Sequence, residues 1–203
     1  MAVETSRTAH PVTDTPRGAA MGTWALWLTV IVLAMLVAGL STAALYLETG
    51  PEPWPPDEFQ VPGRGPAWLA IALTTVATAG ATYALWRIKT ASRRLAALSL
   101  AWSSAALTGA VIALVASLAG AGFRWDEHAY TSAYWSLTGF VITFMGVGLI
   151  VLAAVLTQTV AGLVDEHRHL ELTNAVIYLW FVLGSSTVLL ALVHYLPAAG
   201  EGG

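Results

Sequence analysis

The chain has 203 residues, of which 57% are hydrophobic and only 10% are charged. Soluble domains carry about a quarter charged residues, so this composition predicts a membrane protein. The formal net charge is −3, and no basic excess of the kind used to bind nucleic acid is present. The chain has no cysteine, which excludes disulfides, thiolate metal centres and iron–sulfur clusters.

The first twenty residues are polar, contain two prolines and mix charges of both signs. The apolar run that follows them is longer than the core of a cleaved signal peptide, which is about 7–15 residues. We therefore expect residues 1–20 to form a flexible cytoplasmic tail, and the first apolar segment to direct the chain to the membrane. At the other end, residues 198–203 are expected to form a short external tail.

Five apolar segments are long enough to cross a bilayer, which takes about 20 residues of helix. Backbone groups in lipid must be hydrogen-bonded within the protein, so each segment is predicted to be an α-helix. The expected fold class is an all-α membrane protein with five transmembrane helices. The helices form one domain over residues 21–197, with spans at about 21–47, 68–86, 95–121, 133–164 and 172–196. The fourth span exceeds the bilayer thickness and is expected to tilt or to project beyond the surface.

Basic residues gather on one side of the expected bundle. Seven of the nine Lys and Arg residues fall on the side of the N-terminus and two on the other side. Because cytoplasmic loops carry the positive excess, the N-terminus is predicted to be cytoplasmic and the C-terminus external. The seven are Arg7, Arg17, Arg87, Lys89, Arg93, Arg94 and Arg168, and the two are Arg64 and Arg124.

Six tryptophans lie near the expected helix ends, where an indole places its ring in the acyl region and its N–H in water. They are interpreted as an interfacial belt rather than as a binding site, and they comprise Trp24, Trp27, Trp68, Trp86, Trp125 and Trp135.

Ionisable residues are rare inside the expected spans, where each would indicate a functional site. His194, near the external end of the fifth span, is expected to be an interfacial histidine that reaches water. One marginal histidine cannot supply the pair that holds a membrane haem b, and no chain of acidic groups or histidines suggests a proton relay. Single glycines without proline, at Gly39, Gly109 and Gly184, are only weak signs of the broken helices of ion-coupled transporters.

Polar residues are densest in the turn before the fifth span. Its histidines and carboxylates could bind zinc or copper weakly, but zinc sites show more regular ligand spacing. A solvated turn is the preferred interpretation, as it is for Asp126, Glu127 and His128. The residues of this turn are Glu166, His167, His169 and Glu171.

The third span carries a small residue at every fourth position, which lets a neighbouring backbone approach closely. This pattern suits either packing within the bundle or contact with another subunit, and both interpretations stay open. The series is Ala101, Ala105, Gly109, Ala113, Ser117 and Ala121, with Ala106 and Ala110 beside it.

The entry to the fourth span has the form Y-x-S-x-Y-x-x-x-T-G-F, from Tyr130 to Phe140, and includes Ser132, Tyr134, Thr138 and Gly139. Three further motifs accompany it: Gly22 and Trp24 with Tyr46-Leu47 in the first span, Trp54-Pro55-Pro56 in the next loop, and Tyr178, Phe181 and Val182 in the last span. In these motifs and their order the chain resembles subunit III of the haem–copper respiratory oxidases, in the five-helix bacterial form.

The resemblance implies a non-catalytic accessory subunit in a prokaryotic plasma membrane. Its partners would be the catalytic subunit I and subunit II, which would hold the haem and copper, while this chain would bind no cofactor. It also implies a V-shaped bundle whose cleft holds phospholipids. The residues expected to contact lipid or a partner subunit are Trp24, Trp54, Tyr130, Ser132, Tyr134, Gly139, Phe140 and Tyr178, together with Ala105, Gly109 and Ala113 of the third span.

The chain departs from the family at its buried polar positions. A family glutamate is replaced by Val30, two histidines by Val141 and Phe144, and a histidine and an aspartate by Trp180 and Leu183. Family roles in proton uptake or polar networks therefore do not carry over.

Two other interpretations stay open beside the terminal-oxidase subunit. The first is a similar partner of a nitric oxide reductase. The second is an independent transporter or sensor, with a neutral path lined by Thr74, Thr75, Thr78 and Thr82, although threonine hydroxyls can equally bond to their own helix backbone. A membrane enzyme lacks the acid, base, nucleophile or metal constellation that it would need.

Overall fold

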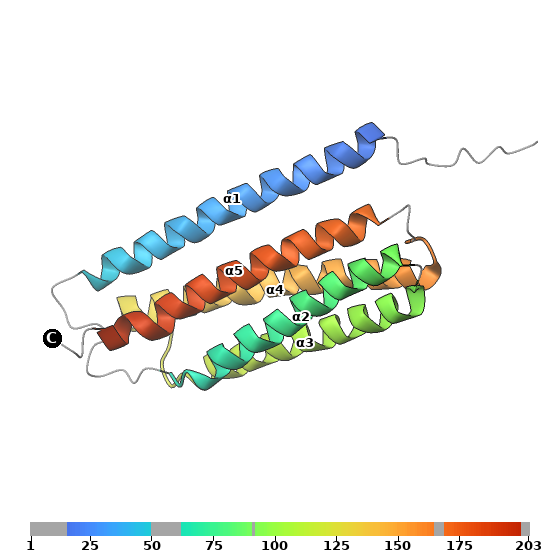
Figure 1. Ribbon diagram of the computed structural model, residues 1–203. Helices are drawn as coiled ribbons and strands as arrows, with labels where there is room; N and C mark the ends of the chain where they lie inside the picture. Colours follow the sequence, from blue (N-terminus) through green and yellow to red (C-terminus); the bar gives the residue numbers. More distant parts are fainter. Residues whose placement is uncertain (1–15, 50–61, 91, 165–168, 200–203) are drawn as a thin grey trace, which may run out of the picture.

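The computed structural model of the protein describes residues 16–49, 62–90, 92–164 and 169–199. Five helices make up almost all of this part of the chain: α1 (Pro16–Glu48), α2 (Gly65–Lys89), α3 (Arg93–Ala119), α4 (Ala129–Ala161) and α5 (Leu170–Ala199) (Figure 1). Each is long and apolar enough to cross a membrane. Over the described residues, the expected all-α fold with five helices long and apolar enough to span a membrane is confirmed.

All five helices run between the same two ends of the molecule (Figure 1). We call one the Arg93 end, where α2 and α4 finish and α3 and α5 begin. The other is the His128 end, where α1 and α3 finish and α2 and α4 begin. Because each helix spans the full length of the molecule, side chains at one end come from several helices.

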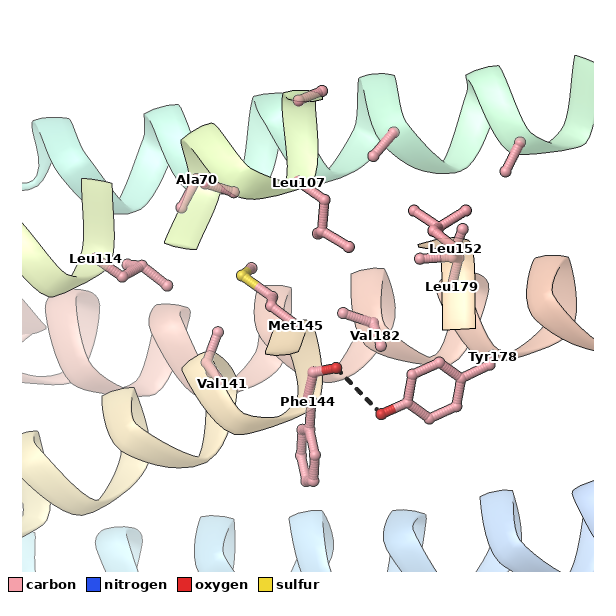
Figure 2. Close-up of a cluster of buried hydrophobic side chains, with 14 of the residues drawn as sticks. Ala70, Leu107, Leu114, Val141, Phe144, Met145, Leu152, Tyr178, Leu179 and Val182 are labelled. Atoms are coloured by element: carbon pink, nitrogen blue, oxygen red, sulfur yellow. Dashed lines mark hydrogen bonds between the residues drawn. The ribbon is translucent and has the colours of Figure 1, made fainter. Parts of the chain in front are cut away.

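Helices α2 to α5 form a four-helix bundle, in which α2 packs on α3, α3 on α4, α4 on α5 and α5 on α2. Its core is apolar and includes Leu107, Met145, Leu152 and Leu179, all fully buried (Figure 2). Helix α1 lies outside this bundle along α5 and also touches α4. Among the described side chains of α1, only Val37 and Ala44 are buried.

Close packing of α2 on α3 depends on small residues. Ala77, Ala81 and Ala84 of α2 are fully buried, and Gly80 faces Ser103 of α3. A Cβ atom added to Gly80 would lie 2.5 Å from Ser103 Oγ of α3. In lipid, such contacts between small residues are a main source of helix association.

Helix α1 begins at Pro16 rather than at Met21, so part of the expected tail is helical. Helix α4 begins at Ala129 rather than at 133, because His128 caps it. The His128 ring nitrogen Nδ1 accepts a hydrogen bond from the Tyr130 backbone N–H at 3.1 Å. The His128 backbone N–H donates to Thr131 Oγ1 at 3.0 Å, which completes a reciprocal cap.

Helix α4 also ends earlier than expected, at Ala161. Gly162 follows it in the left-handed conformation with φ of 79°, which glycine adopts without strain. The exposed carbonyls of this last turn accept hydrogen bonds from Arg93 of α3: its Nε donates to Thr159 O at 2.8 Å and its Nη2 to Val160 O. Arg93 thus fastens the start of α3 to the end of α4.

Replacement of Arg93 by glutamine removes these bonds to the α4 carbonyls. We expect Arg93→Gln to lower the free energy of unfolding by about 1.5 kcal/mol, the low end for charged hydrogen bonds, because the side chain is exposed. Thermal unfolding of the purified protein measures the change. The neighbouring Arg94→Gln, also exposed, should stay within about 0.5 kcal/mol of the wild type, and equal effects of the two would contradict the fastening role.

Candidate functional site: a groove between α1 and α4

An apolar groove of about 350 Å³ lies between α1 and α4 at the His128 end. This volume is within the range of sites that bind small molecules. Among the described residues, its walls contain no ionisable side chain and consist of Leu40, Ala43, Ala44 and Leu47 from α1, and of Ala129, Ser132, Ala133, Ser136 and Leu137 from α4.

The groove exists because both helices present short side chains to each other. The short side chains of alanine and serine do not fill the space between α1 and α4. Helix α1 packs mainly on α5 and has little contact with α4, so the groove between α1 and α4 stays open. Ser132 Oγ already donates to the Trp125 carbonyl at 2.6 Å, which ties the 120–128 loop to α4. What the groove offers a ligand is therefore mainly apolar surface, which suits a hydrocarbon chain.

A smaller cavity of about 20 Å³ adjoins the groove, with Ala44, Ala133 and Leu137 in both linings. Its other walls include Tyr130 and Tyr134, which are 3% and 2% exposed. The space is enough for one water molecule. The two tyrosines that the sequence singled out therefore lie behind the groove, with Ser132 on its wall.

Tyr134 joins three helices at this end. Its hydroxyl and Ser117 Oγ of α3 are hydrogen-bonded at 3.1 Å. Its ring meets His194 of α5 edge-on, with the ring centroids 5.9 Å apart, and Phe123 at 5.5 Å. Aromatic contacts of this geometry add stability beyond the area that they bury.

The expectation that His194 reaches water is wrong, because this side chain is only 3% exposed. The backbone of Pro62, before α2, lies beside its ring. The ring nitrogen Nδ1 has no hydrogen-bond partner within the described part of the chain.

Tyr178 and Phe140 lie away from the groove end, in an aromatic cluster between α4 and α5. The Tyr178 hydroxyl donates to the Phe144 carbonyl at 3.1 Å (Figure 2). Phe144 contacts both Phe140 and Phe181 through its ring. Gly139, which precedes Phe140, has open space beside it, since a Cβ atom there would meet nothing within 4 Å.

The Tyr178 hydrogen bond connects two helices inside the span. We expect Tyr178→Phe to destabilise the protein by about 0.6 kcal/mol, the average for hydrogen bonds between transmembrane helices. Tyr46→Phe is the control, because Tyr46 is 77% exposed. Unfolding midpoints in mixed micelles compare the two, and an unchanged midpoint for Tyr178→Phe would show that the bond adds nothing.

The tryptophans near helix ends are mostly exposed, as an interfacial belt requires. Trp24 is 69% exposed and Trp125 62%. Trp86 is held by Arg87, whose Cζ lies 4.8 Å from its ring centroid. Trp135 differs, because it is half-buried with its Nε1 enclosed. Trp54, expected to contact lipid or a partner, lies outside the described residues.

The small residues of α3 do not share one face. A step of four residues advances about 40° beyond a full helical turn, so the series winds around the helix. Ala105 is exposed, Gly109 faces Leu73 of α2, and Ala113 is half-buried. Packing inside the bundle is carried instead by Ala106 and Ala110, which are buried.

The α2 threonines bond to their own helix. Their Oγ1 atoms donate to carbonyls four residues earlier at 2.7–2.9 Å. Thr74 and Thr78 are buried, whereas Thr75 and Thr82 face outward. The four hydroxyls thus do not converge on one path. The four threonines of this comparison are Thr74, Thr75, Thr78 and Thr82.

Within the described residues, no three His, Asp or Glu side chains come close enough together to hold a metal ion. In the polar turn before α5, Glu166 and His167 lie outside the described part. His169 is half-buried at the start of α5, and its carbonyl accepts a hydrogen bond from Thr173 Oγ1 at 3.0 Å.

The resemblance implied a cleft, but sequence reasoning did not place a groove between α1 and α4, and it did not predict the hydrogen bonds of Arg93 to α4. The groove needs α1 and α4 to be neighbours, and Arg93 needs its partner carbonyls 66 residues further along the chain. The alanines and serines on both helices are the only local signal of the groove. In the comparisons with known proteins, no protein-family model matches the chain and no curated protein matches it either.

Proposed function

We propose that this chain is a non-catalytic accessory subunit of a respiratory haem–copper terminal oxidase, similar to subunit III, in a prokaryotic plasma membrane. It stabilises the catalytic subunit I, beside subunit II, and it binds phospholipid in the groove between α1 and α4. The haem and copper belong to the partner subunits. The N-terminus faces the cytoplasm.

The observation that supports this proposal best is the apolar groove at the His128 end. Its walls and the cavity behind it include Tyr130, Ser132 and Tyr134, which belong to the motif that the chain shares with subunit III. An acyl chain needs apolar walls and no hydrogen bonds, which is what the groove provides. Motif order along the sequence supports the same assignment independently of the groove.

The composition of the bundle core supports a structural role, in which the chain stabilises a partner subunit. It is filled by leucines, alanines and short hydroxyl side chains, and the hydroxyls of the α2 threonines bond to their own helix. Transport along a neutral path would instead need polar groups directed toward a shared opening. Transporter or sensor function is therefore the weaker alternative, and flux in proteoliposomes that contain only this chain would favour it.

Affinity purification of the tagged chain from native membranes tests the assignment. We expect a polytopic subunit with histidine pairs on its helices to co-purify in constant proportion, identified by mass spectrometry. The haem type of the complex separates a terminal oxidase from a nitric oxide reductase. Recovery of a stable lone bundle, without such a subunit, would contradict the proposal.

A further inference from the structure

The turn between α2 and α3 is strongly basic. Four of the eight residues from 87 to 94 are Lys or Arg, and none of the eight is acidic. Arg93 is already bound to the carbonyls at the end of α4, which leaves Arg87, Lys89 and Arg94 as the remaining cations. Within the described part of the chain, no carboxylate forms an ion pair with any of these three. The turn therefore carries positive charge that is available to a ligand.

Arg87 is held in place by two aromatic residues of the preceding helical turn. Its Nε donates a hydrogen bond to the Tyr83 hydroxyl at 2.6 Å. Its Cζ lies 5.0 Å from the centroid of the Tyr83 ring and 4.8 Å from the centroid of the Trp86 ring, distances at which the ring faces attract a guanidinium. These contacts restrain a long side chain in advance, which lowers the entropy cost of binding a ligand.

The outer edge of the Arg87 guanidinium is directed to a ligand rather than to the protein. Tyr83 uses Nε, and the two Nη groups have no acceptor among the described residues. Nη1 and Nη2 form a planar fork that matches two oxygens of a phosphate. The Ser92 backbone N–H donates to the Arg87 carbonyl at 3.0 Å, so the start of α3 lies beside Arg87. Arg94, two residues after Ser92, adds positive charge to this region.

An exposed apolar stripe on α2 leads to Arg87. Leu69, Val76 and Tyr83 are exposed and lie seven residues apart, a spacing that keeps them on one side of the helix. From Leu69 to Tyr83 the stripe is about 21 Å long, which exceeds the half-thickness of a hydrocarbon core, roughly 15 Å. A phosphate-binding group at one end of such a stripe suits a phospholipid, because its phosphate lies next to its acyl chains.

We propose that Arg87, oriented by Tyr83 and Trp86, binds the phosphate of an anionic phospholipid at the Arg93 end of the bundle. Basic residues directly beyond a transmembrane helix attract lipids with net negative charge. A zwitterionic headgroup fits less well, because its ammonium group would meet the cations of the turn and no carboxylate. Glu171, the acidic residue described at this end, forms no ion pair with Arg87.

This site is separate from the groove between α1 and α4. It lies on α2 at the Arg93 end, whereas the groove lies at the His128 end. The groove offers apolar walls, and the Arg87 site adds recognition of the headgroup charge. The inference does not depend on the accessory role proposed above, since it needs only a lipid bilayer around the helices.

Lipid retention by the purified full-length chain tests the site. The chain is reconstituted in nanodiscs of phosphatidylcholine with a minor fraction of phosphatidylglycerol, and native mass spectrometry identifies the lipids that stay bound. We expect the wild type to retain phosphatidylglycerol in excess of its share of the bilayer. Arg87→Gln should lower this retention about tenfold, the loss expected for one charge-assisted hydrogen bond.

Arg124→Gln is the matched control, because it removes an exposed arginine at the other end of the bundle. Arg124 also precedes a tryptophan, but its Nε lies 3.4 Å from a carboxylate oxygen of Asp126, so it should retain phosphatidylglycerol as the wild type does. Arg87→Lys keeps the charge and loses the fork, and its retention should fall between the wild type and Arg87→Gln. An unchanged thermal midpoint shows that each variant is folded.

Inorganic phosphate distinguishes a lipid headgroup from free phosphate as the ligand. At millimolar concentration it should leave phosphatidylglycerol bound, because free phosphate makes no contact with the apolar stripe. Displacement of phosphatidylglycerol by inorganic phosphate would overturn the assignment to a lipid. The proposal would also be overturned by equal retention in the wild type and Arg87→Gln, by an equal loss in Arg124→Gln, or by retention of the two lipids in their bilayer proportion.

Discussion

Gly80→Leu is expected to be the most damaging single substitution in the bundle. Gly80 faces α3, and even a Cβ atom there would be 2.5 Å from Ser103 Oγ. An alanine could be accommodated by rotation of Ser103, but a leucine must push the two helices apart. We expect a loss of about 3 kcal/mol in the free energy of unfolding, the upper part of the usual range for overpacking.

The matched control for this substitution is Gly184→Leu on α5. A Cβ atom at Gly184 meets nothing within 4 Å, and the position is exposed. We expect a change of about 0.5 kcal/mol or less. Unfolding of the purified protein in mixed micelles, followed by tryptophan fluorescence, compares both variants with the wild type. Similar losses at the two glycines would show that the α2–α3 contact is looser than described.

Filling the groove between α1 and α4 should reduce the phospholipid binding that we propose there. Ala43 and Ala133 face the groove from opposite helices, so the double variant Ala43→Phe with Ala133→Phe places two rings where an acyl chain would lie. We expect occupancy of the tightly held lipid to fall about tenfold, which corresponds to about 1.4 kcal/mol of binding free energy. Native mass spectrometry of the purified protein counts the retained lipids.

A control for general effects of added phenylalanine is Ala153→Phe, on an exposed part of α4 away from the groove lining. It should retain lipid as the wild type does. Equal lipid retention by the filled groove and the control would show that lipid binds elsewhere. The thermal midpoint of the filled variant serves as the check on folding.

Local features of the fold could be predicted from the sequence. Five apolar runs of sufficient length indicate five helices, because nothing else satisfies the backbone in lipid. Hydrogen bonds from the α2 threonines to their own helix, one of two stated possibilities, are confirmed. They could be predicted because each acceptor carbonyl lies only four residues earlier in the same helix. The exposure of Trp24, Trp68 and Trp86 also agrees with their position near helix ends.

Features that depend on helix neighbours could not be predicted. Helix α4 begins before its expected start because His128 and Thr131 cap it there. It ends before its expected end because Gly162 adopts a left-handed conformation. His194 is buried because Pro62 and Tyr134 come to it from two other parts of the chain. Such contacts require the helix arrangement, which apolar spacing alone does not determine.

The small residues of α3 also show that helix neighbours cannot be predicted from apolar or small-residue spacing alone. The expectation that one neighbouring backbone could approach the whole four-residue repeat requires a single face, yet the repeat drifts around a helix of 3.6 residues per turn. The structure divides the small residues between an inward set that includes Ala106 and Ala110 and an outward set that includes Ala101 and Ala105. Internal packing, one of the two original interpretations, therefore applies to the inward set, while subunit contact stays a prediction for the outward set.

The haem and copper content of the purified assembly, before and after this chain is stripped away with detergent, tests the central claim most directly. A bracing subunit predicts that all haem absorbance and all copper stay with the partner polypeptides, while the released chain is colourless and free of metal. A chromophore or metal ion that travels with the released chain in fixed proportion would contradict the account.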